Sequence, residues 1–227
     1  MTTKISAAEV AEQLVAAFPR AASADDQWLA RTLFQLLAKG EPVDDAGLAG
    51  ALGRPTEEVS GTLEGPDFAP LLYRDDGERI VGFGGLGVPQ LGETVHRLHV
   101  DRRELYAWCA GDALFLPSTL EREVRVESRC PVTDERISLT VSPQGYRDVD
   151  PPEAVMSMLT PEEVAARTSR GEDVIRSLCH FLFFFASEEA AREWTAEHPG
   201  TVTFPIEEGF ELGRRWIAHK WGIGGGR

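Results

Sequence analysis

The chain has 227 residues and a formal net charge of −14, with 42% hydrophobic and 26% charged residues. This composition is typical of a soluble globular protein and suffices for one large domain or two small ones. The acidic balance argues against a nucleic-acid partner, because phosphates repel an acidic surface. The sequence contains no apolar run of the roughly 18 residues that a membrane span needs, and residues 1–19 lack the basic start of a signal peptide. We therefore expect a cytoplasmic protein with neither a nucleic-acid nor a membrane partner.

Four helices are predicted in the N-terminal part of the chain, over residues 6–18, 25–40, 43–53 and 54–64. Ser6 and Glu9 form a capping-box pattern at the start of the first helix. Trp28 falls on the apolar stripe of the second helix, which Gly40 would cap, and Thr56 would cap the fourth. A helix, a short helix, a turn and a further helix are typical of a winged-helix-like module, which we place at residues 1–72.

DNA binding is the function that such a module suggests, but its charge does not fit. The region from Glu41 to Glu64 has Arg54 as its only basic residue. Its acidic residues are Glu41, Asp44, Asp45, Glu57, Glu58 and Glu64. A recognition helix should be basic or neutral. We therefore expect a helical packing module that does not bind DNA.

Strand patterns dominate the rest of the chain. Asp76-Gly77 predicts a hairpin within residues 70–88. Further strands are predicted at residues 96–100, 123–128, 136–143 and 177–187. A helix with Ser187 as its cap should cover residues 187–200. The predicted class is α+β, with an antiparallel β-sheet core and surrounding helices over residues 73–222, and a disordered tail at 223–227.

The segment "DRRELYAWCAGDALFLP", residues 101–117, places a thiol and a carboxylate in an apolar context. We predict one helix that Asp101 caps and Pro117 ends, so Cys109 and Asp112 would project from one face, away from the positive end of the helix dipole. Buried cysteines are usually inert, but a buried aspartate needs a partner. A carboxylate that accepts a thiol proton can later deliver it elsewhere.

The other two cysteines, Cys130 and Cys179, are distant in sequence, and the chain has no CxxC pair. An odd number of cysteines without an export signal indicates reduced thiols. Cys130 lies in a hairpin loop without activating neighbours, which favours a structural role. In "SLCHFLFFFAS", a regular strand would place Cys179 beside phenylalanines and turn His180 to the other face, where we expect it to pack.

Two thiolates and one carboxylate would suit a soft, thiophilic metal. Magnesium would require oxygen ligands, and zinc usually a fourth protein ligand. An apolar lining would suit an organic substituent on the metal. The sequence leaves open whether Cys179 meets Cys109 and Asp112 in space.

The sequence resembles the organomercurial (alkylmercury) lyases over about residues 25–215. The resemblance is carried by "LYAWCAGD", by "SLTVSP" after a cysteine-bearing loop, by "SLCHFLFFFAS" before a tryptophan-containing helix, and by "LLAKGEPVDDAGLAGALGRPTEEV". It implies that Cys109, Asp112 and Cys179 are the catalytic residues and that they bind mercury as substrate and product. One departure is His180, where members of the family often have a second cysteine.

The resemblance also implies an activity. The family cleaves carbon–mercury bonds by protonolysis to a hydrocarbon and Hg(II), without a cofactor. External thiols release the Hg(II), which passes to cellular thiols or to mercuric reductase. Trp108 and the phenylalanines near Cys179 are candidates for lining the substrate pocket. We expect a monomer or a weak homodimer.

Three alternatives remain open. The first is a non-catalytic carrier of a soft metal, mercury or copper, on the same scaffold. Asp112 favours the enzyme, because a carrier needs no proton donor. The second is a metal-responsive transcription factor, which the acidic helix at residues 56–64 disfavours. The third is a diverged lyase-like enzyme with another substrate.

Overall fold

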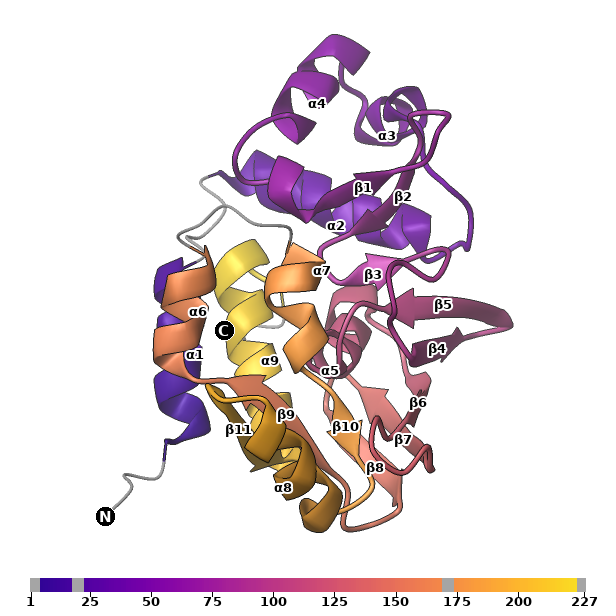
Figure 1. Cartoon of the computed structure of the whole chain (residues 1–227). Coiled ribbons are helices and arrows are strands. Elements are labelled where there is room, and N and C mark those ends of the chain that lie inside the picture. Colours follow the sequence, from indigo (N-terminus) through magenta and orange to yellow (C-terminus); the bar gives the residue numbers. More distant parts are fainter. Residues whose placement is uncertain (1–4, 18–22, 169–173, 224–227) are drawn as a thin grey trace.

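The computed structural model describes residues 5–17, 23–168 and 174–223 (Figure 1). The helices are α1 (Ala7–Ala17), α2 (Ala24–Leu37), α3 (Asp45–Leu52), α4 (Thr56–Leu63), α5 (Ala110–Leu120), α6 (Pro161–Thr168), α7 (Val174–Ser177), α8 (Glu188–Glu197) and α9 (Ile206–Trp221), with short 3-10 turns η1 (Ala69–Leu71) and η2 (Cys179–Phe181). The strands are β1 (Leu72–Arg74), β2 (Ile80–Phe83), β3 (Leu86–Gly87), β4 (His96–Val100), β5 (Arg103–Ala107), β6 (Val124–Arg129), β7 (Arg136–Ser142), β8 (Gly145–Asp150), β9 (Val155–Leu159), β10 (Phe184–Phe185) and β11 (Thr201–Pro205).

Two antiparallel sheets form the core. The larger sheet has eight strands in the order β1-β2-β3-β5-β4-β6-β7-β8, and the smaller has the order β10-β9-β11. Figure 1 shows the helices to the left of and above strands β4–β8, whose other side faces outward. The predicted α+β class with an antiparallel core is confirmed, as are the hairpins β1–β2 and β6–β7 and the strand β4.

The N-terminal module consists of α2, α3, α4 and the hairpin β1–β2, and it is winged-helix-like as predicted (Figure 1). Three details of the prediction were wrong. The α4 helix begins at Thr56, so the N-cap position belongs to Pro55, without a side-chain bond. The α2 helix ends at Leu37, and Gly40 instead serves the following turn with a φ of 80°. Trp28 is 45% exposed, because the opposite face of α2 packs into the core.

The first helix lies apart from this module. The predicted capping box is present, since the Ser6 N–H donates to Glu9 Oε2 at 2.8 Å and the Glu9 N–H donates to Ser6 Oγ at 3.3 Å. The α1 helix packs against α6 and α9, beside the smaller sheet (Figure 1). The first described helix therefore packs among elements from the C-terminal half of the chain.

The segment 101–117 is not one helix. Asp101 has a φ of 54°, a left-handed conformation that closes the tight turn between β4 and β5. Residues Arg103–Ala107 pair with β4 as a strand, and α5 begins only at Ala110. Pro117 lies inside α5, which continues to Leu120. The pattern D-x-x-E at Asp101 thus belongs to a hairpin and not to a helix cap.

The segment 177–187 also differs from its prediction. Only β10, at Phe184–Phe185, is a strand, whereas Cys179 begins the single turn η2. The predicted cap of α8 is confirmed, because Ser187 Oγ accepts the Ala190 N–H at 3.3 Å. Ile223, expected in the disordered tail, is only 2% exposed, and residues 224–227 lie outside the described residues. No helix in the described part of the chain has the length and apolar character to cross a membrane.

Candidate active site

Cys109 lies at the junction of β5 and α5. The strand is held to the loop after β2 by the Trp108 N–H, which donates to the Gly85 carbonyl at 2.9 Å. Cys109 then adopts an extended backbone, with φ −151° and ψ 174°, and is the N-cap of α5. Its Sγ accepts the Asp112 N–H at 3.4 Å. Sulfur here takes the position that a serine, threonine or aspartate oxygen usually occupies at an N-cap.

Asp112 completes this cap in the reverse direction. Its carboxylate accepts a hydrogen bond from the backbone N–H of Cys109. The two residues thus form a capping box with unusual side chains. The expectation that Cys109 lies away from a positive helix end was therefore wrong, since its thiol lies at the N-terminus of α5, where N–H groups favour a thiolate.

Cys179 is brought to this pair by hydrogen bonds to the irregular segment that carries it. The Leu182 carbonyl accepts the Ala110 N–H at 3.0 Å, which joins the segment to the start of α5. Ser157, on β9, donates through Oγ to the Phe181 carbonyl at 2.8 Å and accepts the Phe183 N–H at 3.0 Å. These bonds replace the strand pairing that the sequence suggests.

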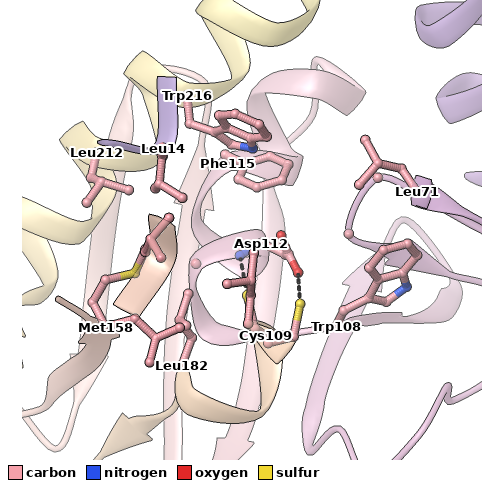
Figure 2. A pocket seen from close by; sticks show the side chains of 18 of the residues that line it. Leu14, Leu71, Trp108, Cys109, Asp112, Phe115, Met158, Leu182, Leu212 and Trp216 are labelled. Carbon is pink, nitrogen blue, oxygen red and sulfur yellow. Dashed lines mark hydrogen bonds between the residues drawn. The ribbon is translucent and has the colours of Figure 1, made fainter. Parts of the chain in front are cut away.

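The three predicted site residues meet in space. The Cys179 thiol donates to Asp112 Oδ2 at 3.9 Å. One ligand atom from each of Cys109, Asp112 and Cys179 lies within 4.8 Å of the others. Figure 2 shows the Asp112 carboxylate directed at a cysteine sulfur. No other residue of the described part of the chain joins this group of possible metal ligands.

Gly85 provides the space for the Asp112 carboxyl group. Its φ is 102°, a conformation that side chains rarely adopt, and a Cβ at this position would lie 2.7 Å from Asp112 Cγ and Oδ1. A close approach of backbone to a functional carboxylate is the physical reason for glycine here.

Burial controls the protonation of the site. It raises the pKa of Asp112 to about 6, although hydrogen bonds from Cys109 and Cys179 oppose this shift. Burial also raises the pKa of the Cys109 thiol well above its usual range, with further contributions from the hydrogen bond to Cys179 and the charge of Asp112, while the Asp112 N–H opposes them. The resting thiol of Cys109 is therefore protonated, and Asp112 titrates near neutral pH.

A partly open cavity of about 90 Å³ is lined in part by the three residues. Its remaining lining is almost wholly apolar and comes from several helices, as Figure 2 shows. Apolar side chains around it include Leu14, Leu71, Trp108, Phe115, Met158, Leu182, Leu212 and Trp216. The predicted lining by Trp108 is confirmed. The phenylalanines after Cys179 do not line the cavity, because their segment is not the regular strand that would have turned them toward it.

The α9 helix, which the sequence analysis did not identify, forms one wall of this cavity. Its signals were present in the sequence: Glu207 and Glu208 in the first turn, His219 and Lys220 in the last, and Gly222 as a left-handed C-cap. The α1 helix contributes Leu14 from the far end of the chain. Both helices reach the cavity only through tertiary packing.

Cys130 and His180 lie outside the cavity lining. Burial raises the pKa of the Cys130 thiol, but the Thr133 hydroxyl and N–H groups of Ala186, Thr133 and Val132 outweigh it, and the pKa is lowered overall. His180 Nε2 is buried without a hydrogen-bond partner among the described residues. Neither residue joins the three ligand groups. The expectation that Cys130 has no activating neighbours was wrong, because these hydrogen bonds stabilise its thiolate.

Two thiols and one carboxyl group beside an apolar cavity define a protein that handles a soft metal ion with an apolar substituent. Comparison with known protein families identifies a family of this class. The family model of alkylmercury lyase matches residues 91–218, and the model of the helix-turn-helix domain of alkylmercury lyase matches residues 9–84. This chain belongs to the alkylmercury lyase family.

Relatives and a solved structure agree over most of the chain. An alkylmercury lyase of Staphylococcus epidermidis is 37% identical over 91% of this chain and 89% of its own length. One from Pseudomonas putida is 39% identical over 83% of this chain and 82% of its own length. The crystal structure of the mercury-bound form of MerB2 has a TM-score of 0.72 and 25% identity, and the match covers 93% of this chain and 97% of that one.

Proposed function

We propose that this protein is an organomercurial lyase, which cleaves the carbon–mercury bond by protonolysis and yields a hydrocarbon and Hg(II). The main support is the position of Asp112. This carboxyl group has a pKa near 6 and lies against two thiols beside an apolar cavity. Membership of the alkylmercury lyase family supports the same reaction. The alternative of a soft-metal carrier receives no support from the comparisons, and a carrier would have no use for this carboxyl group.

The first steps exchange protons for mercury. The thiol of Cys109 or Cys179 displaces the substrate's leaving ligand, and a thiolate–mercury bond replaces the S–H bond. A coordinating thiol is deprotonated by the metal it binds. The second thiol then bonds to the mercury while its proton moves to the Asp112 carboxylate, which is within hydrogen-bond reach of both sulfurs.

The final step breaks the carbon–mercury bond. Donation from two thiolates increases the electron density on the carbon, and Asp112 delivers its proton there. The pair of electrons of the carbon–mercury bond forms the new C–H bond, so mercury remains Hg(II). In total, one organomercurial and two cysteine thiols yield one hydrocarbon, one Hg(II) dithiolate and the protonated leaving ligand. Fixed geometry supplies much of the acceleration, because all three groups are held before the substrate enters.

The apolar cavity would hold the organic group and exclude water. We further propose that Cys109, Cys179 and Asp112 bind the Hg(II) product until external thiols remove it. No separate cofactor is needed. Cellular thiols and mercuric reductase are the proposed acceptors, the cytoplasm is the proposed location, and the oligomeric state is a monomer or weak homodimer. We also propose two units with a boundary near residue 72, an N-terminal module (1–72) and a catalytic domain (73–222), although α1 packs against the second unit and the hairpin β1–β2 crosses the boundary.

The test is hydrocarbon release from a phenylmercury compound in excess thiol. Benzene should appear with the native protein and fall to background with Cys109→Ser, Cys179→Ser and Asp112→Ala. Tight Hg(II) binding without benzene from the native protein would contradict the proposal and favour the carrier. Benzene release that survives Asp112→Ala would refute the role of the carboxyl group as proton donor.

A further inference from the structure

A buried histidine lies behind the site. His96 opens β4 and is 1% exposed, and it is not among the residues that line the cavity. Its Nδ1 lies 2.9 Å from Ser128 Oγ on β6. The ring also forms a hydrogen bond with the backbone carbonyl of Leu182, which we assign to Nε2 because Nδ1 faces Ser128. The ring therefore connects the larger sheet to the segment that carries Cys179.

The partners of the ring determine its tautomer. A carbonyl can only accept a hydrogen bond, so the nitrogen that faces Leu182, Nε2, carries the proton. Nδ1 then has a free lone pair, and the Ser128 hydroxyl donates to it. Burial lowers the pKa of His96 to about 3, which leaves the ring neutral near neutral pH. The arrangement is thus a fixed donor directed at one carbonyl.

The Leu182 carbonyl occupies a central position in the site. It also accepts the N–H of Ala110, the residue directly after Cys109, at 3.0 Å. The Leu182 N–H donates to the Cys179 carbonyl at 3.1 Å. The backbone of Leu182 therefore links the two cysteine-bearing segments, and His96 holds its carbonyl to the larger sheet. Cys179 lies in a single 3-10 turn, so its position depends on such bonds and not on strand pairing.

We propose that His96, oriented by Ser128, is a positioning residue that sets the spacing of the Cys109 and Cys179 thiols by holding the Leu182 carbonyl. Stability alone gives little reason for an imidazole here, because an apolar side chain would pack against Phe183 and Phe184 without desolvating two polar nitrogens. The imidazole instead provides a hydrogen bond to the Leu182 carbonyl, which joins the segment of Cys179 to the segment of Cys109. This inference rests on the proposed lyase function for its catalytic readout.

The test compares two substitutions at this position. The side-chain amide of His96→Gln can still donate from nearly the position of Nε2, whereas His96→Leu fills the space without a donor. We expect His96→Leu to lower kcat for benzene release by about 10- to 100-fold, since a misplacement of about 1 Å can cost that much. KM should change less than about twofold, because the His96 side chain itself does not line the cavity. His96→Gln should recover most of kcat.

A matched control comes from the same strand. His99 also lies on β4, and its partly exposed side chain pairs with Glu127 and not with the Leu182 carbonyl. The substitution His99→Leu should therefore leave kcat unchanged. The melting temperature of His96→Leu should stay within about 5 °C of the native value, the shift expected from one lost hydrogen bond. If activity fell among the variants only in proportion to their melting temperature, the positioning role would be overturned.

A second readout separates this inference from the lyase proposal. Both native protein and variants are titrated with Hg(II) against a competing monothiol, and the mercury–thiolate absorbance is followed in the ultraviolet. His96→Leu should hold Hg(II) at least tenfold more weakly than the native protein, because two thiolates at the wrong spacing cannot both bind it, and His96→Gln should restore binding. Equal Hg(II) affinity in all three would refute the inference, even if the native protein released no benzene.

Discussion

Asp112 should weaken the folded state at neutral pH, and its replacement by asparagine should stabilise it. Burial beside the cavity raises the pKa of this carboxyl group from 3.8 to about 6. Asparagine has nearly the same shape, never ionises, and can keep a hydrogen bond from the cap of α5. We therefore expect Asp112→Asn to abolish benzene release while making the protein harder to unfold.

The size and the pH window follow from the shift. The folded carboxyl group binds its proton more tightly than the unfolded one, so stability falls as pH rises from about 4 to 6. A shift of about two pKa units corresponds to about 3 kcal/mol at 1.36 kcal/mol per unit. The stabilisation by Asp112→Asn should thus be near zero below about pH 4, grow through this window and reach about 3 kcal/mol above pH 6.

Urea unfolding of the native protein and of Asp112→Asn, at intervals from pH 4 to pH 8, measures this difference directly. The exposed turn residue Asp76 offers a matched control, and Asp76→Asn should change stability by less than about 0.5 kcal/mol with no trend in pH. A difference for Asp112→Asn that stays flat with pH, or that is destabilising at pH 8, would show that the carboxylate is not a strained buried charge.

Three further outcomes follow. Gly85→Ala should reduce turnover by about 100-fold, because its Cβ would displace the Asp112 carboxyl group, whereas Gly50→Ala, with open space around it, should be neutral in the same benzene assay. The kcat/KM of the native protein should rise with pH through about 6, since free Asp112 has to be ionised to accept a thiol proton, and a flat profile would count against that role. Cys130→Ser should retain the native rate and lose about 1 kcal/mol in urea unfolding, and a large loss of rate would assign this thiol to catalysis.

Much of the chemistry was readable in the sequence. Cys109 and Asp112 were selected because aspartate is rarely buried without a partner. Two thiols with one carboxylate suit a soft metal, but only the resemblance to the alkylmercury lyases assigned Cys179 to the same site. Local signals also predicted the capping box at Ser6, the hairpin at Asp76-Gly77 and the cap at Ser187, since each depends on residues at most four positions apart.

The meeting of these groups was decided by tertiary structure. A stretch as short as Arg103–Ala107 fits a strand or the first turns of a helix, so only the pairing of β5 with β4 shows that Cys109 caps α5. Cys179 lies 67 positions from Asp112 in the chain, and its turn is held by Ser157 and the Leu182 carbonyl, bonds that no local pattern encodes.

The cavity depends on long-range packing in the same way. Its walls combine Leu14 from α1 with Leu212 and Trp216 from α9, near opposite ends of the chain. Sequence periodicity reports which face of a helix is apolar, but it does not report which partner that face will meet. The sequence by itself therefore determined which reactive groups the protein has, whereas folding determined their spacing, their protonation and the apolar cavity that they line.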